Sequence, residues 1–194
     1  IKVNPRTGRW TMMGVDEEDD KGIGNDDLVG KVQAQAPPTK SSPIGEIFYG
    51  YLMLCANSFQ PAMGYLYRAL ALQQSDPLLC LLCGVASLGR STNRQVDNRN
   101  HTIMQGMALF THYAELRGDI PEVDYNFARA YHHLNLVHLA VPRYERVLQR
   151  ASSKASKGTF DMAREAAFNL AMIFTQSGSP DLARHLYRTW LAVE

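Results

Sequence analysis

Apolar residues recur at three- and four-residue spacing from Pro43 onward, with breaks about every 12 to 16 residues. This spacing is typical of amphipathic helices that pair antiparallel through short turns. No part of this region alternates apolar and polar residues in the way a half-buried strand does. The pattern therefore predicts an all-α protein made of short helical hairpins.

The breaks also follow a period. Pro43 and Pro77 lie 34 residues apart, which is the length of one tetratricopeptide (TPR) unit. Counted from Pro43, the eighth, twentieth and twenty-fourth residues are Gly50, Ala62 and Leu66, which match the small, small and large positions of that motif. Small residues at the first two positions let the paired helices approach closely, and the large residue fills the remaining space.

We therefore expect a TPR-type α-solenoid of about four helix pairs. The expected repeats are residues 43–76, 77–120, 121–154 and 164–194. The second carries about ten extra residues, Gly89 to Asn98, before its second helix resumes at Gly106 and Phe110. An ordinary helical bundle is the alternative, but three prolines and four pairs of small residues in one frame favour the solenoid. The fourth repeat places Tyr187 in the large position.

Residues 1–42 have a different composition. An acidic, glycine-bearing run from Val15 to Asp27 precedes the sequence Gln-Ala-Gln-Ala-Pro-Pro-Thr-Lys-Ser-Ser. Such a segment lacks the apolar content that a packed core needs. We expect a flexible acidic extension or linker.

Charge and cysteine content exclude some functions. The formal net charge of +1 argues against a protein whose main affinity comes from neutralising phosphates or coating an anionic membrane. Three cysteines do not form a disulfide framework and suggest a reducing compartment, the cytosol or nucleus. Residues 47–67 carry no charge, but Asn57, Ser58 and Pro61 divide them into two short helices, so no membrane span is expected.

In a TPR array the first helix of each pair lines a concave groove, and family geometry implies that its second, fifth, ninth and twelfth residues point inward. The groove residues predicted in this way are Ile47, Tyr51, Leu54, Leu78, Leu81, Val85, Leu88, Tyr125, Arg129, His132, Phe168 and Met172. Each large apolar side chain gains about 1.5 to 3 kcal/mol when buried, so we expect a partner to fill this groove. The alternatives are tight superhelical curvature, or cover by residues 1–42.

Cys80 and Cys83 form a C-x-x-C pair, which can bind zinc or do redox chemistry when a second pair accompanies it. Both fall on core-facing positions, as we also expect of Cys55, and buried packing is the favoured interpretation. His132 and His133 diverge by about 100° on a helix, which suits a metal poorly. No catalytic or nucleotide-binding motif is present, so we expect no enzyme activity, cofactor, metal or small-molecule substrate.

Two groups of arginines could bind an acidic peptide or nucleic-acid phosphates. The first is a basic patch of Arg143, Arg146 and Arg150 on one helix face, and the second lies in the expected loop at Arg90, Arg94 and Arg99. A solvated helix face is the simpler interpretation of either group. Contact of the patch with the acidic run 16–20 of the same chain is a third.

The segments QGMALFTHYAELRGD (105–119), YNFARAYHHLNLVHLAVPRYERVL (125–148) and FNLAMIFTQSGSPDLARHLY (168–187) resemble the C-terminal repeats of the TPR subunit of TFIIIC, the RNA polymerase III general transcription factor. The resemblance covers roughly residues 45 to 194. It implies a nuclear scaffold subunit that assembles the promoter-binding complex and supports TFIIIB recruitment. The implied partners are other TFIIIC subunits and TFIIIB components, with DNA contact indirect or minor.

Two other classes remain open. A cochaperone-type adaptor would clamp a C-terminal carboxylate in the groove, and Asn126 and Asn169 fit its asparagine positions. Leu81 and Val85 occupy positions that such a clamp fills with polar groups, and Glu165 would repel a carboxylate. A nucleic-acid adaptor is the third class.

Overall fold

The computed structural model describes residues 2–3, 10–11, 42–94, 96–152 and 162–191. The chain divides into two units, residues 1–41 and 42–194. In the first unit, strands β1 (Lys2–Val3) and β2 (Trp10–Thr11) pair antiparallel, with Val3 opposite Trp10. Apart from these strands and Ser42, the acidic extension predicted for residues 1–42 lies outside the described residues.

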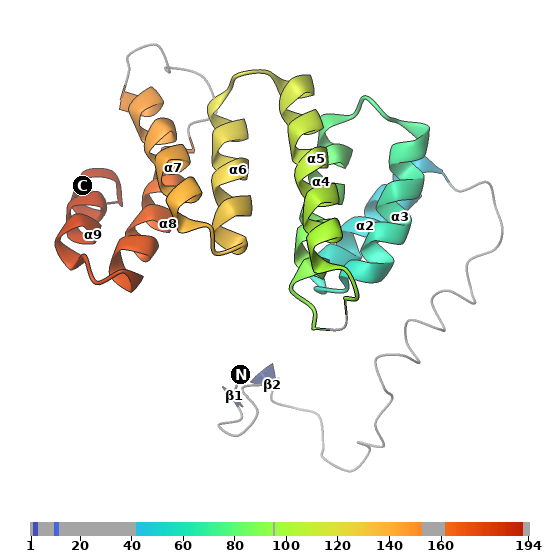
Figure 1. Cartoon of the computed structure of the whole chain (residues 1–194), viewed down its shortest axis with the longest axis horizontal. Helices are drawn as coiled ribbons and strands as arrows, with labels where there is room; N and C mark the ends of the chain where they lie inside the picture. The colour runs from blue at the N-terminus through green and yellow to red at the C-terminus, as the bar shows by residue number, and fades with distance from the viewer. Residues whose placement is uncertain (1, 4–9, 12–41, 95, 153–161, 192–194) are drawn as a thin grey trace. The chain divides into compact units, whose positions relative to one another are not determined.

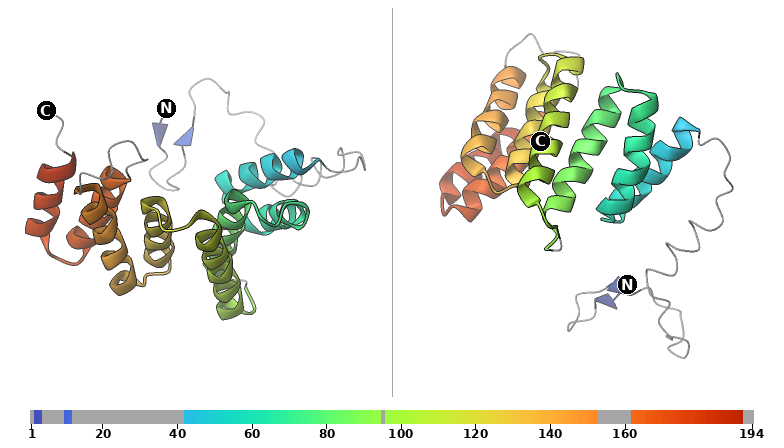
Figure 2. Two further views of the ribbon diagram at one scale, coloured as in Figure 1. Left: turned by 90° about the horizontal axis from the view of Figure 1, so that it is seen from above. Right: turned by 45° about the vertical axis from the view of Figure 1, so that its right-hand side comes forward.

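Within its described residues, the second unit consists of helix pairs that follow one another in chain order (Figures 1 and 2). The pairs are α2 (Pro43–Cys55) with α3 (Phe59–Leu72), α4 (Pro77–Ser91) with α5 (Arg99–Arg117), α6 (Pro121–His133) with α7 (Val137–Ser152), and α8 (Ala163–Gln176) with α9 (Pro180–Leu186). The α9 helix continues into the π-helix η2 (Tyr187–Leu191). The predicted all-α solenoid is confirmed. None of the helices in the described ranges combines the length and apolar character of a membrane-crossing segment.

The starts of the helices are encoded locally. Proline opens α2, α4, α6 and α9, at a position where the missing N–H would have no partner within the helix. The carboxylate of Asp76 accepts the backbone N–H of Leu78 at 2.8 Å and caps α4. The side chain of Asn98 caps α5 in the same way, by accepting the N–H of His101 at 2.9 Å. These caps hold two helix starts of the second pair.

Three of the turns within pairs share one backbone conformation. Asn57, Asn135 and Gly178 each follow a first helix in the left-handed region, with φ angles of 56°, 60° and 78°. The residue after each donates its N–H to the carbonyl five positions earlier, at 2.8 Å in all three turns. This bond closes the helix end and turns the chain directly into the second helix.

Small and large residues fit together between the helices of a pair. A Cβ atom on Gly50 would lie 2.6 Å from Cγ of Leu66, and one on Gly84 would lie 2.8 Å from Cδ2 of Phe110. Both large side chains are buried. The eighth residue of the repeat therefore has to be small where the twenty-fourth packs against it.

The fourth pair differs from this pattern. Tyr187, which the sequence places in the large position, is 38% exposed. The α-helix ends at Leu186 and the chain continues as a π-helix, which rotates Tyr187 away from the expected direction. Trp190 packs against the core of this pair instead.

The extra residues of the second pair lengthen its helices as well as the loop between them. Residues Gly89 to Ser91 extend α4, and α5 begins directly after Asn98, so only residues 92–98 connect the two helices. Of the three arginines assigned to the inserted loop, Arg90 and Arg99 belong to the helices and Arg94 alone lies between them. The capping side chain of Asn98 explains the early start of α5.

The second and third pairs meet through a polar contact beside a small apolar cluster. Contact between α5 and α6 is the least extensive among consecutive helices within the described residues. Tyr113 of α5 is buried there, and its hydroxyl donates to Oε1 of Glu122 at 2.8 Å and accepts from Nδ2 of Asn126 at 2.9 Å. Arg117 forms an ion pair with the same Glu122 carboxylate. Burial, together with the bond to Glu122, raises the pKa of Tyr113 to about 12, so its hydroxyl remains a donor at neutral pH.

We expect Gly84→Ala to destabilise the protein. The added methyl would overlap the buried Phe110 ring, and overpacking costs about 1–3 kcal/mol, against a gain of about 1 kcal/mol in helix propensity. Urea unfolding followed by circular dichroism measures the net loss. Gly64→Ala on the exposed side of α3, where the nearest atom is Nη1 of Arg68 at 3.8 Å, is the matched control and should stabilise the protein. Equal stabilisation by both variants would contradict the packing described above.

A second prediction concerns the turn at Asn135. Alanine in the left-handed region costs about 1–2 kcal/mol, whereas glycine adopts it freely. Asn135→Ala should therefore lower the free energy of unfolding by about 1 kcal/mol, and Asn135→Gly should leave it unchanged or raise it. Thermal unfolding of the two variants side by side tests this, and the same loss in both would show that the backbone angle is not the cause.

Candidate partner-binding surface

The first helices of the pairs lie next to one another and form one surface. Helix α2 contacts α4, and α4 contacts α6. Asn169 of α8 donates a hydrogen bond to the hydroxyl of Tyr125 of α6, at 3.3 Å. We define the inner face as the surface that carries the ninth positions of the four repeats, counted from residues 43, 77, 121 and 164, and all helix positions below are counted in this frame. These residues are Tyr51, Val85, Arg129 and Met172.

The inner face exposes large apolar side chains. Tyr51, Val85 and Met172 are 53%, 42% and 39% exposed, and Leu78 and Phe168 are 53% and 49% exposed. Four other predicted groove residues are half-buried and pack against the core clusters beneath this face, namely Ile47, Leu54, Leu81 and Tyr125. The apolar part of the predicted groove is thus accessible mainly at its second and ninth positions, and at the fifth position only in the fourth repeat.

Leu88 does not belong to this surface. It is 2% exposed, because α4 and α5 approach closely at Gly106, where an added Cβ atom would lie 2.9 Å from Cδ2 of Leu88. The twelfth position points outward only where the second helix leaves room for it. Leu88 is therefore a core residue, and we remove it from the predicted groove.

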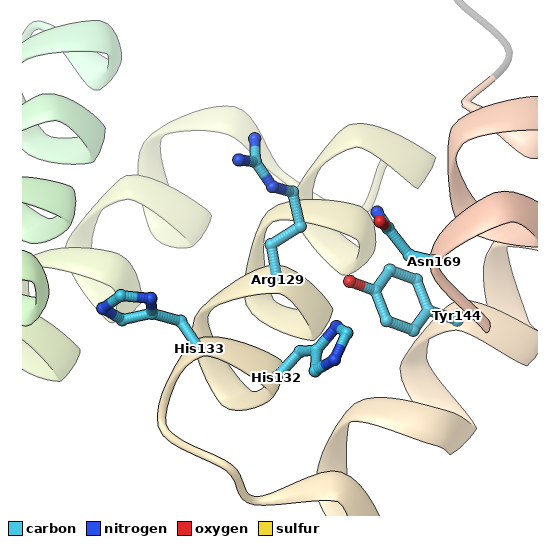
Figure 3. A pocket seen from close by; sticks show the side chains of 5 residues that line it. All are labelled: Arg129, His132, His133, Tyr144 and Asn169. Atoms are coloured by element: carbon cyan, nitrogen blue, oxygen red, sulfur yellow. The ribbon is translucent and has the colours of Figure 1, made fainter. Parts of the chain in front are cut away.

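A polar pocket of about 260 Å³ interrupts the apolar surface between α6, α7 and α8. Arg129, His132, His133, Tyr144 and Asn169 line it (Figure 3). In Figure 3 the hydroxyl of Tyr144 points into the space between Arg129 and His132. This hydroxyl is buried and has no hydrogen-bond partner among the described residues. A buried hydroxyl without a hydrogen-bond partner destabilises the fold unless a ligand forms a hydrogen bond with it.

The charges around the pocket favour an acceptor ligand. Burial raises the pKa of Tyr144, which keeps the hydroxyl protonated. Burial also lowers the pKa of His132, and the neighbouring His133 adds to this effect, so His132 is neutral at neutral pH. No carboxylate of the described residues lines the pocket, and the guanidinium of Arg129 supplies its positive charge. The pocket can therefore receive a carboxylate or a peptide carbonyl.

The sequence did not identify all of this pocket. Arg129 and His132 were predicted groove residues, and Asn169 was noted as a possible clamp residue. Tyr144 occupies the large position of the third repeat, where the motif predicts a residue that fills the space between the paired helices. Residue size alone does not show that the tip of a buried ring reaches the surface, so only the phenolic hydroxyl itself could have raised the question.

The predicted basic patch is paired within the protein. Nη1 of Arg143 lies 2.7 Å from Oδ1 of Asp124, and Nε of Arg146 lies 2.9 Å from Oδ2 of the same carboxylate. Nη2 of Arg150 lies 2.6 Å from Oδ1 of Asp119, and this contact, together with Arg146, lowers the pKa of Asp119. One positive charge remains in excess. The cluster joins α6 to α7, so much of its charge serves the fold. Contact of the patch with the acidic run 16–20 lies outside the described residues.

The two cysteines of the C-x-x-C pair have low reactivity. Cys80 and Cys83 are fully buried, and burial raises the pKa of both thiols, that of Cys83 to about 12. A thiol that stays protonated is a poor nucleophile and a poor metal ligand. Cys55 is exposed, contrary to the expectation that it is buried, because it is the last residue of α2 and lies beyond the packed part of the helix. Within the described residues, no three His, Cys, Asp or Glu side chains gather in a way that could hold a metal ion.

Comparisons with known proteins identify relatives of this chain. No family model matches it. It is 34% identical over 184 residues to the transcription factor tau subunit sfc4 of Schizosaccharomyces pombe, which covers 87% of this chain and 18% of that protein. It is 31% identical to the transcription factor tau 131 kDa subunit of Saccharomyces cerevisiae, over 81% of this chain and 15% of that subunit. Human general transcription factor 3C polypeptide 3 is 27% identical, over 76% of this chain and 17% of the human protein. The chain thus spans less than a fifth of the length of each of these relatives.

The basic cluster leads to a prediction about stability. Asp124→Asn removes a carboxylate whose side chain is 2% exposed and deprives Arg143 of its ion pair, whereas Arg146 and Arg150 keep their contacts with Asp119. These arginines are about one-third exposed and can turn to water, so we expect a loss of about 1–2 kcal/mol rather than the larger cost of a fully buried pair. Asp181→Asn, which breaks an exposed pair with Arg184, should change the free energy of unfolding by less than about 0.5 kcal/mol. Urea unfolding of both variants provides the test, and equal effects would contradict a structural role for the cluster.

Proposed function

Since this chain is homologous over most of its length to one region of the TFIIIC transcription factor subunits, we propose that it is an interaction scaffold within an RNA polymerase III transcription factor complex. In this proposal it works in the nucleus, joins other subunits of the promoter-binding complex, and supports the recruitment of TFIIIB. The relatives are transcription factor subunits, and a role without catalysis fits them.

The observation that carries the proposal is the inner face. It exposes Tyr51, Leu78, Val85, Phe168 and Met172 along neighbouring helices. Exposed apolar side chains gathered on one face mark protein interaction sites, and each such side chain gains about 1.5–3 kcal/mol when a partner covers it fully. The polar pocket at Arg129 would fix the register of a bound segment through a carboxylate or carbonyl.

The basic cluster supports an indirect or minor role for DNA. Asp119 and Asp124 neutralise most of the charge of Arg143, Arg146 and Arg150. Nucleic-acid affinity depends on cations that are free to displace counterions from phosphates. The larger part of the binding energy is therefore expected from apolar contacts with proteins.

Few features support a cochaperone-type carboxylate clamp. The amide of Asn126 donates to the Tyr113 hydroxyl and so holds the junction between the second and third pairs. Val85 presents an apolar side chain at a groove position, and Glu165 is exposed on α8. A carboxylate clamp needs donors at such positions.

The test is co-purification of the full chain with the remaining TFIIIC subunits after co-expression. Val85→Glu combined with Met172→Glu places two charges on the inner face at exposed positions. We expect this variant to lose the TFIIIC subunits while its melting temperature stays within about 3 °C of the parent value.

The matched control is Leu72→Glu combined with Met104→Glu, which adds the same charges at exposed positions on the second helices. It should retain the subunits. Equal binding by the two variants would rule out the inner face as the interface. Binding of an acidic C-terminal peptide, with no retention of TFIIIC subunits, would favour the cochaperone-type adaptor instead.

A further inference from the structure

The seventh and tenth residues of the first helix are buried in the second, third and fourth pairs. Their exposed fractions are 0% for Cys83 and Ala86 in α4, 7% and 4% for Phe127 and Ala130 in α6, and 1% and 3% for Leu170 and Ile173 in α8. In each case the second helix of the preceding pair lies against this side of the first helix. These positions thus form the interface between successive pairs.

The core clusters identify the contacts at these interfaces. Cys83 and Ala86 belong to one cluster with Leu66 and Ala69 of α3. The ring of Phe127 lies 5.6 Å from that of Phe110 of α5. The third interface joins α8 to Val147 and Leu148 of α7. The seventh and tenth positions of the first helix therefore form the contact with the preceding pair at all three interfaces.

Within the part of the chain that the structure describes, the equivalent residues of α2 have no such cover. Tyr49 and Leu52 are 45% and 42% exposed, and the adjacent Phe48 is 57% exposed. We call these three residues the leading face. The ring of Tyr49 lies 5.8 Å from the rings of Phe48 and of Tyr65 on α3, so the aromatic surface is held in place from within its own pair. It is uncharged, and its seventh- and tenth-position residues Tyr49 and Leu52 lie on a different side of α2 from the inner-face residue Tyr51. Phe48, three residues before Tyr51, lies between the two faces.

We propose that the leading face binds the second helix of a further TPR-type pair, supplied from outside residues 42–194. The occupant is specified by the three filled equivalents, in which a second helix presents apolar residues to the seventh and tenth positions. This interface is separate from the inner face and extends the array in the direction of its first pair.

Two observations support the presence of such a helix. The relatives are more than five times as long as the region that this chain matches, so additional chain is available in proteins of this kind. A short connection is also unnecessary, because α7 ends at Ser152 and α8 begins at Ala163, yet the two helices pack together. A pair joined to α2 by a connection of at least this length can therefore stack on it.

Whether the leading face can bind a second helix is tested by grafting one next to it. A second copy of residues 43–76 is inserted between Ser42 and Pro43, which places a copy of α3 ahead of α2. A second graft also carries Tyr49→Cys and Leu52→Ala, which restore the residues that α3 meets in α4. We expect slower amide hydrogen exchange in α2, and a melting temperature about 5 °C higher, most clearly in the second graft. Unchanged exchange in both grafts would overturn the proposal.

The native chain supplies the remaining controls. Tyr49→Glu with Leu52→Glu should preserve the fold, whereas Leu170→Glu with Ile173→Glu, at the equivalent buried positions, should unfold the last pair. Unfolding of the first variant would show that the leading face is already part of the core and would overturn the proposal.

Two other possible occupants of the leading face, a second copy of the chain and residues 1–41, are tested separately. Sedimentation velocity should show a monomer; a dimer that Tyr49→Glu with Leu52→Glu dissociates would assign the face to a second copy. Deletion of residues 1–41 should leave hydrogen exchange in α2 unchanged. Faster exchange after the deletion would assign the face to that segment, and either result would overturn the proposal.

Discussion

The array depends on the close approach of the two helices within each pair, which is possible where a small residue faces a large one. Gly50 against Leu66 and Gly84 against Phe110 leave no room for a Cβ atom, and Ala128 and Tyr144 are both fully buried in the third pair. Close contact fixes the rotation of each first helix about its axis. The ninth residue then faces outward on the inner face, and the seventh and tenth face the neighbouring pair. The positions of both candidate interfaces follow from this one constraint on residue size.

Buried carboxylates of the array are paired with arginines within the protein. Glu46 is buried and pairs with Arg68 at 2.8 Å, and Asp124 holds arginines of α7 in the same manner. These pairs join the two helices of one repeat, where a buried carboxylate needs a partner. The pocket on the inner face instead presents the guanidinium of Arg129 beside the unsatisfied hydroxyl of Tyr144, among exposed apolar side chains. This division suits recognition of a protein segment better than recognition of a phosphate backbone.

Much of the fold was predictable because the period is carried by local signals. Prolines mark helix starts at Pro43, Pro77 and Pro121, and residue sizes mark the packing positions. The site was less predictable. Counting along a helix shows to which side a residue points, but not which other helix packs against that side. Leu88 has the right direction and is buried, because α5 comes unusually close there. The pairing of the arginines with Asp119 and Asp124 links residues about 20 to 30 positions apart, which no local pattern specifies.

The contact at Tyr113 lies between the first two and the last two helix pairs of the array. Apolar surfaces can slide over one another with little loss, but hydrogen bonds to Glu122 and Asn126 hold only one relative orientation. Because this is the smallest contact between consecutive helices within the described residues, it is where a repeat array bends or opens first. Tyr51 and Val85 lie on one half, and Arg129 and Met172 on the other. Bending at this contact changes the distance between the two halves of the inner face. A partner that contacts both halves therefore holds them in one relative orientation.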